Sequence, residues 1–283
     1  MLNYQRTKIQ EKLSLNDQAA GLRRIMSSPK PRIVSILSTS PNHDHARLMA
    51  NLATPIADNG FDVLILVASD ECNANIYEVE NQPTLLDVIN EKTLLQSAIK
   101  NTGNGFSIAK LMPSHQVDSP LDLILGQQLN SIFCKLAEQY EIVLVDVAIN
   151  SDDLLPLKAL NEGEIIIKLN RQTESIKDSY ALIKKIYNQL GSRSFGIIVD
   201  NATESQAQAI FVNISEVAKR FLNIELEFFG AIPPDVHLSR AAKLGRTVME
   251  AFPLASASSA FKLIAERLNG KYTDKTKLAS LIE

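Results

Sequence analysis

The hydrophobic positions of this 283-residue chain form short continuous runs separated by stretches with helical spacing. Runs that are apolar at nearly every position are typical of strands in a parallel sheet whose two faces are both covered. Two shorter segments, Phe106–Met112 and Glu227–Ile232, also predict strands. The five continuous runs are Ile33–Leu37, Val63–Ala68, Ile142–Val147, Ile165–Leu169 and Phe195–Val199.

The stretches between these runs carry apolar residues at the spacing of one helix face. Within a predicted helix over His43–Asn59 they are Met49, Leu52, Ala53 and Ile56. Two further predicted stripes are Ile176, Tyr180, Ile183 and Tyr187, and a weaker one of Ala209, Val212 and Ala218 within Ser205–Phe221. The alternation predicts a doubly wound α/β fold, a mostly parallel sheet with helices on both faces.

Two segments flank the predicted α/β domain. Ser14–Met26 begins with a loose capping box and carries one apolar stripe, and the linker Ser27–Pro31 ends it. The chain therefore divides into a helix and linker over residues 1–31, the α/β domain over 32–270 and a tail over 271–283. So short a helix is marginal alone in water, which indicates that it folds against something.

Composition narrows the class of protein. A net charge of −3 and a pI near 5.9 argue against a dedicated nucleic-acid binder. Cys72 and Cys134 lack metal-binding spacing and are expected to be reduced, buried thiols. The sequence shows no apolar signal segment and no membrane-spanning run, so we expect a cytoplasmic protein.

The most informative loop is Thr39–Ala46, between the first predicted strand and the first helix of the domain. In α/β proteins this place normally holds phosphate, using glycines, a lysine and a Ser/Thr hydroxyl for Mg²⁺. The loop has no glycine and no lysine, Pro41 lacks an N–H donor, and Asp44 would repel an anion. The position suits a phosphate site, but the residues that such a site needs are missing.

The triplet His43-Asp44-His45 suggests a metal site, but adjacent positions at a helix start point in different directions. No Cys or Glu cluster nearby completes a ligand set, so we expect a solvated loop and no metal. The sequence also contains no Ser/His/Asp triad, reactive cysteine or paired-carboxylate site.

Four groups of segments match the motifs of one known family in order and spacing. They are Asp17–Arg23 (DQAxxLR), Asn51–Ala53 with Asp70 and Ala74–Ile76 (NLA and the end of DADLGLANV), Ser175–Leu182 (SxxDxYAL), and Gly230–Asp235 with Val248–Pro253 (GxIPxD and VxEAFP). The chain thus resembles the flagellar-number regulators FlhG, FleN and YlxH of the MinD/ParA superfamily, which have a MinD-like P-loop fold.

The resemblance aligns the deviant Walker A sequence of that family, KGGVGKT, with Ser40–Ala46. Ser40 replaces the signature lysine, Asn42 a glycine, His45 the phosphate-gripping lysine and Ala46 the Mg²⁺-binding threonine. Asp70, one of two paired aspartates, and Asp146, at the Walker B position, survive. The resemblance therefore implies a pseudo-ATPase with vestigial nucleotide-site positions, no catalytic residue and no cofactor.

Three surviving aspartates also have ordinary structural interpretations. Asp146 at a strand end is expected to cap a neighbouring helix or to bond a loop amide. Asp235 is expected to cap a helix. Asp70 is expected to be a turn residue. Asp200, by contrast, stands where the family places an asparagine that contacts adenine, which weakens even a remnant of base binding.

In the family, the N-terminal helix stimulates FlhF, a GTPase of the signal-recognition-particle type. The resemblance assigns this role to Asp17, Gln18, Leu22 and Arg23. A Gln carboxamide can orient an attacking water while an arginine offsets phosphate charge. Without a partner, the segment would be an amphipathic arm packed on its own domain. Flagellar switch or regulator proteins are further candidate partners.

A second interpretation keeps nucleotide chemistry, with ATP and Mg²⁺ as cofactors. The protein would then be an ATPase of the same superfamily that cycles between a cytosolic monomer and a membrane-bound dimer. In the tail, Leu278, Leu281 and Ile282 could form a short apolar face. Three such residues bind a bilayer weakly, so we expect membrane contact at the inner face of the cell membrane to be weak or indirect. The sequence does not decide the oligomeric state.

Overall fold

The structure is a computed structural model that describes residues 30–39, 45–69, 79, 81–113, 122–149 and 154–279, with the backbone alone at 45, 46 and 271–279. The chain separates into two units, Met1–Lys30 and Pro31–Glu283. The predicted N-terminal helix lies outside the described residues.

The second unit is built on one eight-stranded sheet with the order β3-β4-β2-β5-β1-β6-β7-β8. Every neighbouring pair is parallel except β3 and β4. The strands are β1 (Arg32–Ser38), β2 (Val63–Ala68), β3 (Ile99–Asn101), β4 (Phe106–Lys110), β5 (Ile142–Val147), β6 (Glu164–Asn170), β7 (Phe195–Asp200) and β8 (Leu226–Ile232). The predicted doubly wound, mostly parallel α/β fold is confirmed.

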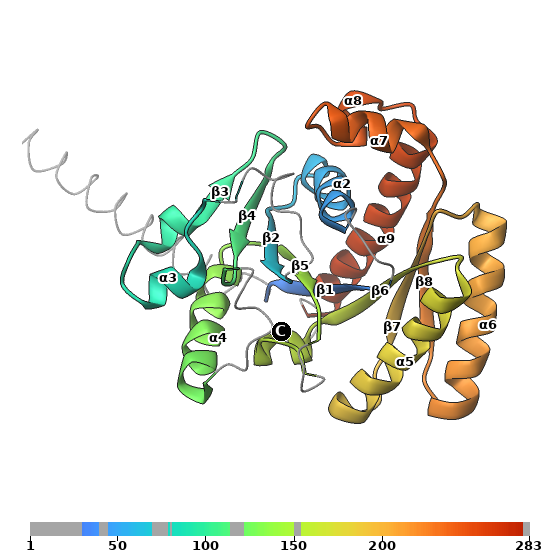
Figure 1. Cartoon of the computed structure of the whole chain (residues 1–283), viewed down its shortest axis with the longest axis horizontal. Coiled ribbons are helices and arrows are strands. Elements are labelled where there is room, and N and C mark those ends of the chain that lie inside the picture. Colours follow the sequence, from blue (N-terminus) through green and yellow to red (C-terminus); the bar gives the residue numbers. More distant parts are fainter. Residues whose placement is uncertain are drawn as a thin grey trace, which may run out of the picture. The chain divides into compact units, whose positions relative to one another are not determined.

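Helices cover both faces of the sheet (Figure 1). Helices α2, α7, α8 and α9 gather on one side of the picture, and α4 and α5 lie on the other. The helices are α2 (His45–Asp58), α3 (Leu85–Ile89), α4 (Leu123–Ala137), α5 (Thr173–Leu190), α6 (Glu204–Leu222), α7 (Val236–Lys243), α8 (Val248–Ala251) and α9 (Ser256–Ala279), with short 3-10 helices η2 (Leu95–Ala98) and η4 (Lys158–Glu162).

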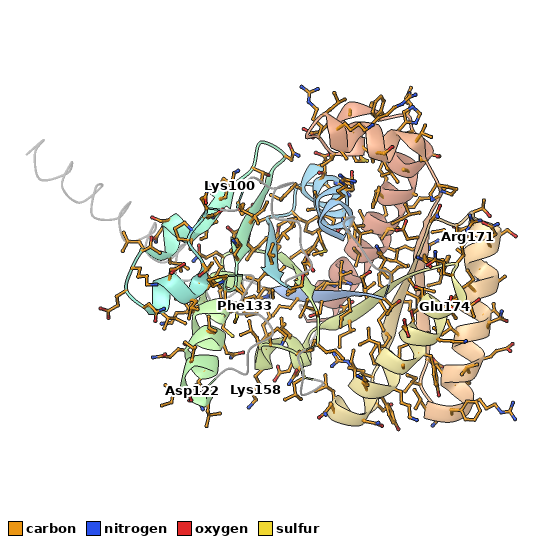
Figure 2. The ribbon with its side chains drawn as sticks, in the orientation of Figure 1. Lys100, Asp122, Phe133, Lys158, Arg171 and Glu174 are labelled. Carbon is orange, nitrogen blue, oxygen red and sulfur yellow. The ribbon has the colours of Figure 1, made fainter. Side chains whose placement is uncertain are left out.

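Each face of the sheet has its own core. The predicted stripe of α2 is completely buried in the core that includes α9, as period-3.6 spacing requires. The opposite core contains residues of α4, α5 and α6, among them the fully buried Phe133 labelled in Figure 2. The predicted stripe of α5 packs there, with Ile183 fully buried.

The predicted stripe of α6 is wrong, because Ala209 and Val212 are exposed and only Ala218 of the three is buried. The buried residues of α6 are Ala207, Ile214, Ala218 and Leu222. They define a face rotated away from the predicted one. Alanines occur on both faces of this helix and carry too little hydrophobicity to mark the buried side.

Helix α9 continues past Gly270, the position at which the sequence predicted a separate tail. The backbone therefore has no break at that boundary. Among the described residues, no helix is both long enough and apolar enough to cross a bilayer.

Candidate functional site

The loop singled out in the sequence connects β1 to α2 at the carboxyl edge of the sheet. Strand β1 lies between β5 and β6. From this point the chain adds β2 on one side and β6, β7 and β8 on the other, so the loop lies at the topological switch point. In open α/β sheets this crevice is where ligands bind. Arg171 and Glu174, labelled in Figure 2, mark the adjacent β6–α5 connection at the same edge.

Six neighbouring strands carry a polar residue at or near their carboxyl ends, on the face that α2 covers, and we call this set the polar row. Each member lies two residues beyond a buried residue of the core under α2, so strand alternation places it on the same face. The polar row consists of Lys110 (β4), Ser69 (after β2), Asp146 (β5), Ser38 (β1), Lys168 (β6) and Asp200 (β7).

Asp146 is the member of the polar row that sequence analysis had selected. Its side chain is 1% exposed, and its Oδ1 accepts a hydrogen bond of 2.8 Å from the hydroxyl of Ser69. This partner is a side chain just beyond the end of the neighbouring strand β2. The bond ties the ends of β5 and β2 together.

Lys168 is completely buried in the interior of the sheet, next to β1. Its Nζ lies 3.5 Å from Oδ2 of Asp200 at the end of β7. Asp200 is the residue that the resemblance aligns with an adenine-contacting asparagine, and here it forms an ion pair. Sequence analysis missed Lys168, although a lysine inside the run Ile165–Leu169 is a usable signal.

The end of β1 is bound to α5 by hydroxyl groups. Oγ1 of Thr39 lies 2.7 Å from Oγ of Ser179 and 3.1 Å from Oγ of Ser175. The Thr39 amide donates to the carbonyl oxygen of Lys168 at 3.1 Å. Both serines are buried, and Ser175 Oγ also accepts from the Asn170 amide at 3.1 Å. The first residue of the loop is thus held by several hydrogen bonds.

Two of the motif segments meet between α2 and α8. Oδ1 of Asn51 accepts a 2.7 Å hydrogen bond from the amide of Val248, the first residue of α8. Nδ2 of Asn51 donates to the carbonyl oxygen of Arg47 at 2.7 Å. The side chain is buried, so both halves of its amide are used within the fold. This contact gives the Asn51-Leu52-Ala53 motif a structural role.

Asp235 caps two helices at once, which confirms its prediction as a cap. Oδ1 accepts from the amide of His237 at 2.9 Å at the start of α7. Oδ2 accepts from the Ala257 amide at 3.0 Å and the Ser256 hydroxyl at 2.8 Å at the start of α9. Burial acts to raise the pKa of this carboxyl, but these hydrogen bonds and one from His237 hold the pKa well below its ordinary value.

Most of the predicted site residues lie outside the described part of the chain. This holds for Asp17, Gln18, Leu22 and Arg23, and for Ser40, Asn42 and Asp70, while His45 and Ala46 are described by their backbone alone. Among the residues that are described, none of the His, Cys, Asp and Glu side chains gather into a metal site. Cys134 is half-buried, and burial together with Glu138 and Glu162 raises the pKa of its thiol.

The similarities of this chain to known proteins agree with its fold. The chain matches no known family model. It is similar to the antiactivator FleN of Pseudomonas aeruginosa, with 27% identity over 249 residues that cover 86% of this chain and 89% of that protein.

Solved structures share the fold at lower identity. The cell division protein MinD of Aquifex aeolicus matches with a TM-score of 0.62 and 21% identity, over 84% of this chain and 97% of that one. A putative plasmid partition protein of Borrelia burgdorferi, bound to AMPPNP, matches with a TM-score of 0.64 and 16% identity, over 86% of this chain and 100% of that one. The chain therefore has the fold of the MinD/ParA proteins and is similar to FleN along most of its length.

Proposed function

We propose that this protein regulates flagellar number or placement through protein contact and that its own ATPase site is inactive. The observation that carries most of the proposal is the similarity to FleN along 86% of the chain. That relative is named an antiactivator, a name that fits a regulatory protein. The Asp17–Arg23 segment supports the flagellar branch of the family, because the resemblance assigns a helix with this motif to that branch.

The residues at the phosphate-binding place support the inactive ATPase. Residues 40–46 hold no glycine and no lysine, and an alanine stands at the hydroxyl position for Mg²⁺. Phosphoryl transfer depends on positioning and on neutralising the charge of the triphosphate, and this donor set supplies neither. Next to the loop, the ammonium group of Lys168 is already paired with Asp200, and Asp146 is bonded to Ser69.

The proposed partner is a GTPase of the signal-recognition-particle type that resembles FlhF. The N-terminal helix would dock on it, with Gln18 orienting the attacking water and Arg23 offsetting phosphate charge. Leu22 and Asp17 would hold the helix in place. A flagellar switch or regulator protein is a further proposed contact of the α/β domain, because the relative FleN is named for its effect on an activator.

The test is GTP hydrolysis by the partner with wild-type protein, Gln18→Ala and the control Gln10→Ala. Gln10 lies in the same N-terminal segment outside the DQAxxLR-like motif. We expect stimulation by the wild type and by Gln10→Ala, and loss of most of it with Gln18→Ala. Equal stimulation by all three proteins would remove the role of Gln18, and no stimulation by any would remove this partner.

The second candidate is an ATP-binding protein that cycles between a monomer and a membrane-bound dimer. The observation in its favour is the fold, since the similar plasmid partition protein holds AMPPNP. Steady hydrolysis of ATP that is lost in Asp146→Asn would favour this candidate over a regulator without turnover.

A further inference from the structure

The outer face of α7 carries a stripe that no other part of the described chain covers. Val236, Arg240 and Leu244 follow one another at four-residue spacing, and Lys243 lies beside them, so all four share one face. Val236 is 63% exposed and Leu244 is 61% exposed. The opposite face of α7 is buried through Ala241. The exposed face is therefore a real surface of a packed helix.

Another exposed aliphatic residue, Leu254, lies near the start of α7. It is 98% exposed, in the turn between α8 and α9. Two contacts hold that turn against α7, namely Ser256 with Asp235 at 2.8 Å and the rings of Phe252 and His237, whose centroids lie 4.7 Å apart. We call Val236, Arg240, Lys243, Leu244, Arg246 and Leu254 the α7 stripe. Figure 1 shows α7 and α8 together beyond α2 and α9, on one side of the sheet.

In the α7 stripe, Arg240 and Lys243 lie between the aliphatic residues Val236 and Leu244, and Arg246 follows Leu244. No hydrogen bond or ion pair joins the side chains of Arg240, Lys243 or Arg246 to any residue in the described part of the chain. Between Val236 and Ala265 the sequence has one acidic residue, Glu250.

Both nearby carboxylates are already engaged. Glu250 Oε2 accepts from the amide of Thr247 at 3.0 Å and from Nδ2 of Asn104 at 3.2 Å. Asp235 accepts hydrogen bonds at the starts of α7 and α9. Three cations against these two carboxylates leave the surface with net positive charge, which favours an acidic occupant.

The free ends of the chain are not acidic. Residues 1–29 contain five basic and two acidic residues, and residues 271–283 contain three basic and two acidic ones. Both segments have the same sign of charge as the stripe. A second copy of the stripe would also repel it, because a two-fold contact sets the same cations against each other. Neither terminal segment nor a second stripe supplies the complementary charge, which favours a separate partner molecule as the occupant.

The arrangement of charges and aliphatic residues favours a protein over a lipid bilayer or nucleic acid. Helices that lie on bilayers keep apolar and basic residues on opposite faces, whereas here both share one face. Insertion of Val236 and Leu244 would press Arg240 into the hydrocarbon layer. A nucleic acid would gain little from three cations and would leave the aliphatic residues without a partner.

We infer that the α7 stripe docks an acidic segment of a protein partner. Carboxylates of that segment would pair with Arg240, Lys243 and Arg246, and apolar residues on either side of them would contact Leu254 with Val236 at one end and Leu244 at the other. This surface is separate from the N-terminal helix of the proposed function. It gives the protein a second place of contact.

Fluorescence anisotropy with a labelled helical peptide tests this. The probe has two Glu residues one turn apart and a Leu one turn beyond each, and the control probe has Lys in place of Glu. The test protein is the full chain with Arg240→Glu/Lys243→Glu. The matched control is Lys177→Glu/Lys184→Glu, the same charge change at two exposed positions of α5.

We expect wild type and the α5 control to bind the Glu peptide and to discriminate against the Lys peptide. Arg240→Glu/Lys243→Glu should bind the Glu peptide at least about tenfold more weakly and should prefer the Lys peptide. Leu254→Ser should weaken binding without changing the preference, which separates apolar contact from charge. All substituted residues are exposed, so thermal unfolding should be unchanged.

Equal binding of the two peptides by wild type, or equal losses in the two double variants, would overturn the inference. Tight binding to phosphatidylglycerol vesicles that disappears in Arg240→Glu/Lys243→Glu would also overturn it, in favour of a membrane. These readouts do not involve GTP hydrolysis, so their failure is distinct from a failure of the Gln18 test.

Discussion

The hydroxyl of Ser69 donates a hydrogen bond of 2.8 Å to Oδ1 of Asp146, and both side chains are buried. Asp146 stands at the Walker B position of the family resemblance, and it is the one predicted nucleotide-site side chain that the structure describes. Its bond to Ser69 joins the carboxyl ends of β2 and β5. The polar row continues on both sides of these two strands. The aspartate therefore has a structural reason to be present that does not require a nucleotide.

Ser69→Ala should lower the free energy of unfolding by about 2 kcal/mol, because a buried carboxylate loses a hydrogen-bond donor. Denaturant unfolding measures this directly. The control is Ser259→Ala on the exposed side of α9, which should change stability by less than about 0.5 kcal/mol. Equal stability of the two variants would show that the Ser69–Asp146 bond contributes nothing.

Asp200→Asn should destabilise the fold by about 2 kcal/mol, since it leaves the ammonium group of Lys168 buried without this carboxylate. The effect is below that of a fully buried pair because the side chain of Asp200 is 28% exposed. The double variant Lys168→Met/Asp200→Asn should recover part of the loss. Additive losses in a double-mutant cycle would contradict a coupled pair.

The contribution of Asp235 to stability should depend on pH. The folded state lowers the pKa of this carboxyl, so its stabilisation is complete above the unfolded value near 4 and is lost as the pH falls through the lower, folded value. The difference in unfolding free energy between wild type and Asp235→Asn should be constant above about pH 5 and shrink below about pH 4. A difference that grows towards low pH would refute the capping geometry.

Gly196→Ala should destabilise the protein by about 1–3 kcal/mol through overpacking. A Cβ at this position of β7 would lie 2.7 Å from the ring of Phe229 and 2.8 Å from Ile166. Gly126→Ala on α4 is the matched control, because a Cβ there meets nothing within 4 Å. That change should stabilise the helix by about 0.5–1 kcal/mol. Thermal unfolding of the two variants should therefore shift in opposite directions.

The central strands were predictable because both of their faces are buried. Runs such as Val63–Ala68 and Ile142–Val147 are apolar throughout and coincide with β2 and β5. The edge strand β3 was not predicted, since Ile99–Asn101 is three residues long and has no buried position. A strand of this kind carries almost no hydrophobic signal.

The candidate site was only partly predictable. The place of the β1–α2 loop followed from the order of strands and helices, and Asp235 was predicted as a cap. The partners of Asp146 and Asp200, however, come from other strands far away in sequence, so only the fold brings Ser69 and Lys168 to them. The role of Asn51 has the same origin, because its partner Val248 lies 197 residues further along the chain.

The most direct test of the central claim, regulation by contact without ATP turnover, is titration calorimetry of the full chain with ATP and Mg²⁺. The partition protein of Borrelia burgdorferi, whose structure holds AMPPNP, serves as the positive control. The account predicts no saturable binding by this chain under conditions in which the control binds. Binding with a dissociation constant of about 1 μM, which corresponds to a binding free energy of about −8 kcal/mol, would contradict it.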